Sequence, residues 1–154
     1  MKLATLLYIR NSKGEYLLMN RQRNPNKGLL SPPGGKLHAD EAESPSACAV
    51  REAMEECSMV TNKDDWRLAG IITEKNFPEA GNIMIFIMNY KKPYDILPPP
   101  CNEGDFSYAN PDEIPDMKIP ETDRQFIWKL VMKESPEPFL VTLDCTNYPE
   151  ISVV

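Results

Sequence analysis

The stretch SPSACAVREAMEECS, residues 44–58, is the part of the chain whose pattern most constrains the fold. Serine followed by proline is a strong helix start, because the Ser44 hydroxyl can accept from the first free N–H groups and Pro45 fits the first helical position. Apolar residues then recur at intervals of three and four, at Ala47, Val50, Met54 and Cys57. This spacing predicts a helix with that stripe as its buried face.

Glutamates crowd the later half of the predicted helix. At about 3.6 residues per turn, Glu52, Glu55 and Glu56 fall on one side, which we expect to lie opposite the apolar stripe. Like charges three and four positions apart repel, and negative charge near a helix C-terminus is disfavoured by about 0.3–1 kcal/mol. A hard divalent cation such as Mg²⁺ would offset both costs, because it takes oxygen ligands. An acidic face that is simply solvated is the alternative that this pattern leaves open.

A pair of glycines, Gly34 and Gly35, stands between a short apolar piece at residues 29–31 and the acidic helix. Glycine lets the backbone approach a ligand closely and aim its N–H or C=O groups at it. Two glycines alone would indicate only a flexible loop. Followed by the glutamates at a fixed spacing, they indicate a binding turn.

Outward from this segment, the chain reads as strands joined by turns. The first two strands are expected to pair as a hairpin through the turn at 11–14, and the next two through the loop at 78–81. The predicted strands are residues 3–9, 16–19, 66–77, 82–90, 105–109 and 139–143. The tail at 151–154 reads either as a strand or as a frayed end.

A second amphipathic helix is predicted after residue 122. Thr122 and Gln125 have the spacing of a capping box, and apolar residues follow at Phe126, Ile127, Leu130 and Val131. Strands outnumber helices and no internal repeat is visible. We therefore expect one mixed α/β domain over residues 1–154.

Composition excludes several classes of protein. The chain has 154 residues, of which 42% are hydrophobic and 26% charged, as in ordinary globular proteins. Its net charge of −6, without basic runs, argues against a stable complex with nucleic acid. No apolar run approaches the roughly 18 residues that a membrane span needs. The four cysteines form no CxxC pair, which favours free thiols in a reducing compartment such as the cytoplasm.

The segment that ends at Met59 resembles the Nudix box, G-x5-E-x7-R-E-U-x-E-E-x-G-U, where U is a bulky apolar residue. The matching positions are Glu43, Arg51, Glu52, Glu55, Glu56 and Met59. Seven residues instead of five separate Gly35 from Glu43, so residues 38–41 look like an insertion that leaves the catalytic spacing intact. Ser58 replaces the second glycine of the box, and serine tolerates a positive φ less well in the turn that ends the helix.

The resemblance extends beyond the box. Glu103-Gly104, then Tyr108 and the stretch 112–115, is similar to the E-G-x-x-x-W-x-x-x-D-E-I-P stretch of MutT-type members, with Tyr in place of Trp. Residues 2–143 look collinear with the family. The resemblance implies a Nudix α/β/α sandwich with a mixed β-sheet.

The resemblance also implies a reaction, in which water attacks a diphosphate with the help of Mg²⁺, or Mn²⁺ as a substitute. The residues that it implies as metal ligands are Glu52 and Glu56, then Glu55, Glu103 and a backbone carbonyl near Gly34. Glu52 or Glu103 would be the general base, Glu55 a further ligand or water partner, and Arg51 would hold the carboxylates in place.

A second set of residues is implied in substrate binding. Arg21 and Arg23 lie in the loop where nucleotide-directed members contact phosphate, although solvated loop cations are the alternative. Asp123 follows Pro120, where some purine triphosphate members place base-reading acids. Ser31 stands where some purine-specific members carry asparagine, so it does not support selectivity for 8-oxoguanine. Gly35 and Lys36 complete the set.

The expected substrate is a nucleoside triphosphate, canonical or oxidised, hydrolysed to monophosphate and pyrophosphate. The alternatives are an ADP-sugar or ADP-ribose pyrophosphatase, and a catalytically silent Nudix-fold module that only binds nucleotides. Silent modules usually lose the glutamates of the box, and this chain keeps them. We expect a monomer or homodimer with a small nucleotide as its partner, without membrane association.

Overall fold

The computed structural model describes residues 1–154, which form two β-sheets and few helices. The larger sheet has the strand order β4-β1-β6-β5-β8-β9, and the smaller has the order β3-β2-β7. The strands of the larger sheet are β1 (Lys2–Tyr8), β4 (Gly34–Lys36), β5 (Trp66–Phe77), β6 (Gly81–Tyr90), β8 (Phe139–Asp144) and β9 (Ser152–Val153). Those of the smaller are β2 (Tyr16–Arg21), β3 (Leu30–Ser31) and β7 (Gly104–Ala109).

The larger sheet is mixed, as expected. β1 runs parallel to β6 and antiparallel to β4, while β5 runs antiparallel to β6 and parallel to β8. The predicted hairpin at 78–81 is confirmed by the pairing of β5 with β6. The tail pairs with β8 through β9, so it is a strand.

The hairpin predicted between the first two strands is wrong. The turn at 11–14 does reverse the chain and is closed by a bond from the Asn11 N–H to the Glu15 carbonyl. Beyond it, the pairing stops at a bridge between Arg10 and Tyr16 and a bond from the Leu17 N–H to the Ile9 carbonyl. β2 pairs with β3 and β7 instead. Both edges of β1 are already occupied by β4 and β6, so no edge remains for β2.

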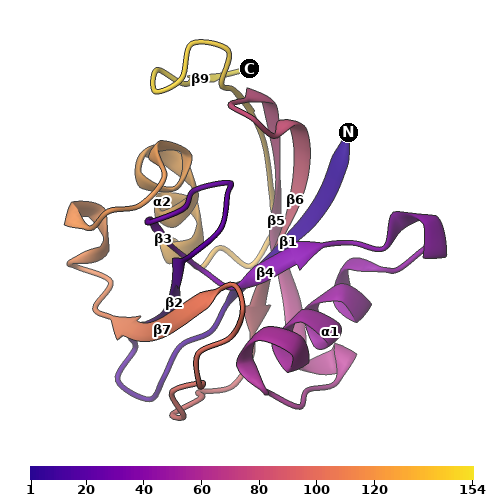
Figure 1. The fold of residues 1–154 in the computed structure, drawn as a ribbon, viewed down its shortest axis with the longest axis vertical. Helices are drawn as coiled ribbons and strands as arrows, with labels where there is room; N and C mark the ends of the chain where they lie inside the picture. The colour runs from indigo at the N-terminus through magenta and orange to yellow at the C-terminus, as the bar shows by residue number, and fades with distance from the viewer.

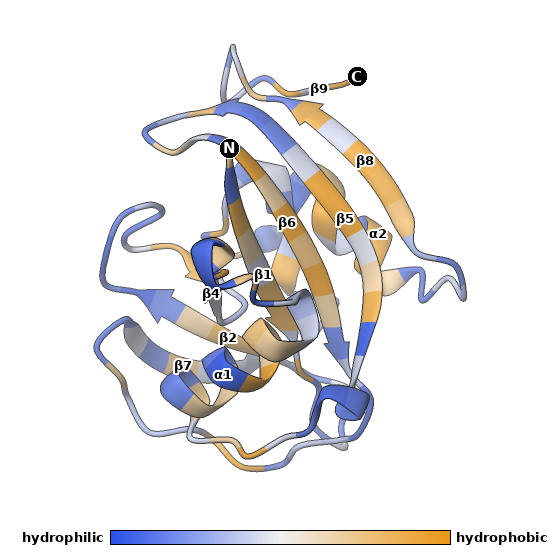
Figure 2. Ribbon diagram, turned by 90° about the vertical axis from the view of Figure 1, so that its right-hand side faces the viewer, coloured by the Kyte–Doolittle hydropathy of each residue, from blue (hydrophilic) through white to orange (hydrophobic).

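The two main helices cover opposite faces of the larger sheet (Figure 1). Helix α1 (Pro45–Cys57) packs on β1 and β4, and its Ala49, Ala53 and Cys57 join one apolar cluster. Helix α2 (Trp128–Met132) contributes Trp128 and Val131 to the other cluster. Figure 2 shows α1 in front of the strands and α2 behind them. No helix is long and apolar enough to cross a membrane.

Helix α1 begins as predicted but buries a different face. The Ser44 hydroxyl accepts from the Ala47 N–H at 3.1 Å, with proline at the first helical position. Met54, however, is 46% exposed, whereas Glu52 and Glu56 are buried. Small residues let this face lie close to the sheet, and the glutamate carboxylates reach past them into a cavity, so the expected separation of acidic and apolar faces does not occur.

The second helix also differs from its prediction. Thr122 already has helical φ and ψ and makes no capping bond, so the predicted capping box is absent. Gln125 instead donates to the Glu121 side chain at 3.1 Å. A π-helical segment (Asp123–Ile127) precedes α2, and it places Asp123 in a buried position.

Candidate functional site

One cavity of about 1130 Å³ is lined by α1, β1, β4 and the loops after β2 and before β7. All the residues predicted from the sequence to act in catalysis, metal binding or substrate binding line this cavity. These are Arg21, Arg23, Ser31, Gly34, Gly35, Lys36, Arg51, Glu52, Glu55, Glu56, Glu103 and Asp123. The tertiary fold therefore brings segments from β2 to the second helix into one site.

Arg51 is the centre of an ion-pair network on α1. Its guanidinium holds Glu43 through two bonds, at 2.7 Å from Nε and 2.8 Å from Nη2. Nη1 contacts Glu52 at 2.9 Å and Glu55 at 3.1 Å, and Nη2 donates to the Lys36 carbonyl at 2.9 Å. The guanidinium lowers the pKa of Glu43 to about 2. Arg51 thus links the residue before the helix, the glycine-containing strand and the acidic face.

The two glycines bring β4 against the buried glutamates. A Cβ at Gly35 would lie 2.3 Å from Oε1 of Glu52, so only glycine leaves room for that carboxylate. Gly34 has a φ of 154°, and a Cβ there would lie 2.1 Å from the Thr5 carbonyl oxygen. The Gly34 N–H donates to Oε1 of Glu56 at 2.8 Å. The N–H of Gly34 thus contacts the acidic cluster directly, and the metal contact that the resemblance implies for a carbonyl near Gly34 stays a prediction.

The two buried glutamates, Glu52 and Glu56, have raised pKa values. Burial, helped by the neighbouring Glu52 and Glu103 and partly offset by the Gly34 N–H, raises the pKa of Glu56 to about 8. Burial also raises the pKa of Glu52, against the effect of Arg51. Glu55 is different, because its side chain is 56% exposed. Carboxylates that face one another without enough positive charge are suited to receive a cation.

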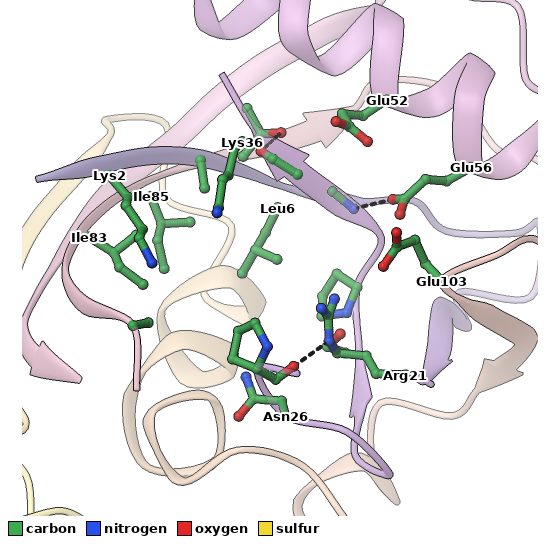
Figure 3. Close-up of a pocket in the computed structure, with 18 of the residues that line it drawn as sticks. Lys2, Leu6, Arg21, Asn26, Lys36, Glu52, Glu56, Ile83, Ile85 and Glu103 are labelled. Carbon is green, nitrogen blue, oxygen red and sulfur yellow. Dashed lines mark hydrogen bonds between the residues drawn. The ribbon is translucent and has the colours of Figure 1, made fainter. Parts of the chain in front are cut away.

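Glu103 reaches the same region from the loop that leads into β7. Figure 3 shows Glu52, Glu56 and Glu103 gathered at one end of the cavity, with Arg21 across from them. Nη1 of Arg23 lies 3.7 Å from Glu103, and Nε of Arg21 donates to the Pro25 carbonyl at 2.8 Å. Arg23 therefore stands beside the acidic cluster while its side chain is 61% exposed to solvent.

These carboxylates fit a divalent metal ion by chemistry but do not enclose one. No three acidic, histidine or cysteine side chains stand close enough together to form a metal site. Arg51, the Gly34 N–H and Arg23 each hold one member of the acidic group, Glu52, Glu56 and Glu103 respectively. Carboxylate oxygens, among them those of the buried Glu56, are the hard donors that suit Mg²⁺.

The cavity also contains a buried acid, Glu74, that the sequence did not single out. Glu74 of β5 is 4% exposed and lines the cavity together with Thr122 and Asp123. Glu74 pairs with Ile83 across β5 and β6, and Figure 3 shows Ile83 and Ile85 on the side of the cavity away from Glu52, Glu56 and Glu103, with Leu6 between. A charged residue that shares a strand face with the buried Ile72 was the available signal for Glu74.

The inserted segment and several aromatic side chains also have defined positions relative to the cavity. The inserted segment at 38–41 lies at the rim of the cavity, where His38 contacts Glu41 at 2.9 Å. Of the aromatic residues, Phe77 lines the cavity, whereas Tyr90, Tyr94 and Phe106 pack against the apolar cluster under α1.

Comparisons with known proteins identify the family and the fold. A family model described as the NUDIX domain matches residues 1–130. The MutT protein of Bacillus halodurans superposes with a TM-score of 0.80 at 23% identity, covering 100% of this chain and 97% of that one. The MutT protein of Methanosarcina mazei Go1 gives 0.72 at 24%, over 87% and 95%. The NUDIX domain of Shewanella oneidensis NrtR, in complex with ADP ribose, gives 0.68 at 15%, over 86% and 85%.

Proposed function

Because the chain belongs to the Nudix family, we propose that it is a Mg²⁺-dependent hydrolase that cleaves a nucleoside triphosphate into monophosphate and pyrophosphate. The observation that supports this most is the convergence of Glu52, Glu56 and Glu103 at one end of a single cavity, with loop arginines beside them. The acidic group provides oxygen ligands, and the arginines provide charge for the phosphates.

Each residue then has a distinct role. Glu52 and Glu56 would be the principal metal ligands, with Glu55 and Glu103 as further ones. The metal, when bound, would neutralise phosphate charge and lower the pKa of the attacking water. Arg51 orients Glu52 and Glu55 through its bonds to both. Glu52 or Glu103 would accept the proton of the attacking water.

Substrate binding is assigned to the positively charged residues and the glycines of the cavity. Arg21, Arg23 and Lys36 would contact the phosphates, because their positive charge lines the cavity next to the glutamates. Gly34 and Gly35 would border the bound substrate, because both line the cavity and hold Glu56 and Glu52 close to β4. When a phosphate draws Arg23 away, the Glu103 carboxylate becomes free for the metal or the water.

A second candidate is an ADP-ribose pyrophosphatase. It is favoured by the likeness to the NrtR NUDIX domain, whose structure contains ADP ribose. At 15% identity that likeness extends to the fold, so the triphosphate remains our first proposal. A silent binding module is disfavoured because the box glutamates Glu52, Glu55 and Glu56 are all present and line the cavity.

The test is a panel of canonical and oxidised triphosphates, ADP-ribose and dinucleoside polyphosphates, assayed with Mg²⁺ for phosphate-containing products. We expect triphosphates to be the best substrates and EDTA to abolish turnover. In Glu56→Gln, turnover should fall by at least about 100-fold, since a metal ligand contributes several kcal/mol. Glu137→Gln, at an exposed position outside the cavity, should change nothing. Turnover that persists without metal would refute the proposal.

A further inference from the structure

A second, smaller cavity lies at the opposite end of the larger sheet from the proposed active site. It encloses about 270 Å³ and shares none of its lining residues with the larger cavity. On β1, Lys2 borders the larger cavity and Tyr8 borders the smaller one. At about 3.3 Å per residue, these two positions are about 20 Å apart along the strand. β5 and β6 also contribute opposite ends to the two cavities, so the smaller cavity is a separate site.

One wall of this smaller cavity is a row of side chains that crosses three strands. Tyr8 pairs with Asn89 across β1 and β6, and Asn89 pairs with Arg67 across β6 and β5. Paired residues point to the same face of a sheet, so these three side chains share one face. Two and four positions earlier on β6, Ile87 and Ile85 fill that face with core side chains. The polar end of the row therefore interrupts a face that is otherwise apolar.

Positive charge is concentrated in this cavity. Arg10, Arg67 and Lys91 line it, and Glu134 is its only carboxylate. Arg10 is paired with Glu134, and its guanidinium carbon lies 5.7 Å from the centroid of the Tyr16 ring. Arg67 and Lys91 form no ion pair. The cavity thus has a charge excess of two, in a chain whose net charge is −6.

Two of the polar side chains also lack partners within the protein. Arg67 and Asn89 are half-buried, and neither side chain makes a hydrogen bond. A guanidinium has five N–H donors and an amide has two, so this wall offers donors that the fold does not use. Unused donors beside an excess of positive charge suit an anionic acceptor.

The charge and size of the cavity favour a phosphate group. A phosphate monoester carries about 1.5 to 2 negative charges at neutral pH, which matches the charge excess, whereas a carboxylate would leave part of it unmatched. The guanidinium fork of Arg67 fits phosphate oxygens, and Lys91 adds a point charge. Pockets for drug-sized ligands occupy about 300–1,000 Å³, so this smaller cavity suits the phosphate group rather than a whole nucleotide.

We propose that this cavity is a second anion-binding site, in which Arg67, Lys91 and Asn89 hold the phosphate group of a small molecule while Arg10 borders it. Orthophosphate, pyrophosphate and a nucleoside monophosphate all carry such a group. The proposal does not rest on the proposed function, because no residue assigned to the metal or to the substrate lines this cavity.

Nuclear magnetic resonance can observe the two cavities separately in one sample. The ¹⁵N-labelled protein is titrated with orthophosphate in EDTA at neutral pH and constant ionic strength, because salt screens such contacts. The backbone amides of Asn89 and Lys91 report on the smaller cavity, and those of Gly34 and Gly35 report on the larger one. We expect saturable shifts at Asn89 and Lys91 with one common affinity. Shifts that are absent, or that grow linearly without saturation, would overturn the proposal.

Substitutions then identify the side chains that bind. In Arg67→Gln the affinity measured at Asn89 and Lys91 should fall by at least about 10-fold, because the charge-assisted bonds are lost. Lys91→Gln should lower it by a smaller factor, about 3-fold, since an exposed point charge contributes less. Arg23→Gln, the same change at a cation of the larger cavity, should leave it unaltered. The spectrum of each variant shows whether it is folded. An affinity that neither Arg67→Gln nor Lys91→Gln lowers would refute the assignment.

Further ligands define the class and the source of the anion. Pyrophosphate and GMP should bind at this site within about 10-fold of orthophosphate, because only the phosphate group is held, and acetate should bind at least about 10-fold more weakly. A larger preference for pyrophosphate or GMP would support the site and identify that compound as its source of phosphate. Acetate that binds as tightly as orthophosphate would overturn the phosphate class.

The same titration separates this inference from the proposed hydrolysis, because it needs neither metal nor turnover. If no nucleotide is hydrolysed but phosphate saturates the shifts at Asn89 and Lys91, the proposed function fails and the second site stands. If triphosphates are hydrolysed but these amides do not respond to phosphate, the second site is refuted and the hydrolysis stands.

Discussion

Glu56 and Glu74 have the same side chain, and burial acts on both in the same direction. Glu56 accepts from the Gly34 N–H beside other glutamates, and Glu74 lies near Asp123 at the far end of the cavity. In each case burial raises the pKa to about 8. A group whose folded pKa lies above its unfolded value stabilises the protein while protonated, and that stability is lost as pH rises from about 4.5 through about 8.

The first residue-scale prediction concerns Glu56 without metal. Glutamine can still accept from the Gly34 N–H but carries no charge, so Glu56→Gln in EDTA should be more stable than the unmodified protein by about 1 kcal/mol or more at pH 9. At pH 5 the two should be equal. Urea unfolding at both pH values measures the difference. A variant that is less stable at pH 9 would show that Glu56 is held by compensating positive charge.

The same variant also tests metal binding at this residue. Mg²⁺ added at pH 8 should raise the Tm of the unmodified protein, because a ligand of the folded state stabilises it. The rise should be much smaller in Glu56→Gln and unaffected by Glu137→Gln. Equal rises in the unmodified protein and Glu56→Gln would place the ion elsewhere.

At the scale of the element, the end of α1 depends on a residue with an unfavourable backbone conformation. Ser58 has a φ of 53°, and bonds from the Ser58 and Met59 N–H groups to the Met54 and Ala53 carbonyls close the helix. The turn expected for glycine therefore forms with serine, at the cost of left-handed strain. The position of Glu55 and Glu56 is kept because the helix still ends at Cys57.

Ser58→Gly should therefore raise the free energy of unfolding by about 0.5–1 kcal/mol, the relief of strain being partly offset by the entropy of glycine in the unfolded chain. Ser46→Gly, the same change in the first turn of α1, should not stabilise. Thermal or urea unfolding of both variants measures the two changes in the free energy of unfolding. No gain at Ser58 would mean that its left-handed geometry is not strained.

The short strand β4 leaves room for the Glu52 carboxylate, because Gly35 has no side chain. In Gly35→Ala the new methyl group would displace the Glu52 carboxylate, so we expect kcat to fall by about 10–100-fold, because misplaced catalytic groups lose that much. Gly14→Ala is the control, since Gly14 has a φ of 79° in a turn outside the cavity. That variant should lose stability but keep its kcat. Unchanged kcat in Gly35→Ala would show that Glu52 needs no fixed position.

At the scale of the whole molecule, the two sheets share their cores. Trp128 of α2 packs edge-to-face on Tyr8 of β1 and Tyr16 of β2, with ring centroids 4.9 Å apart in both cases. The cluster around it includes residues of both sheets and the second helix. The cavity lies where these parts meet, so its shape depends on their joint packing.

Trp128→Ala should lower the free energy of unfolding by about 3–5 kcal/mol. It leaves Trp66, which belongs to the opposite cluster under α1, as the sole indole. If the molecule unfolds as one unit, Trp66 fluorescence and far-UV circular dichroism should report the same, lowered urea midpoint. A Trp66 transition that stays at its original midpoint would show that the two cores unfold independently.

Local sequence patterns were sufficient to predict several elements of this protein. The Ser44-Pro45 start of α1, the β5–β6 hairpin and the mixed α/β class follow from capping, turn and periodicity rules that act over a few residues. The spacing from Glu43 to Glu56 likewise determined that Arg51 could reach Glu43, Glu52 and Glu55, since one helix turn sets those distances.

Only the tertiary structure decided which surfaces meet. Whether β2 paired with β1 depended on β4 and β6 already holding both edges of β1, and whether Glu52 and Glu56 faced water depended on how closely α1 could approach β4. Glu74 and Asp123 are 49 positions apart in the printed numbering, and no local rule brings them together. Long-range packing of the sheet against the second helix places both in one cavity, and burial there gives ordinary carboxyls their altered acidity.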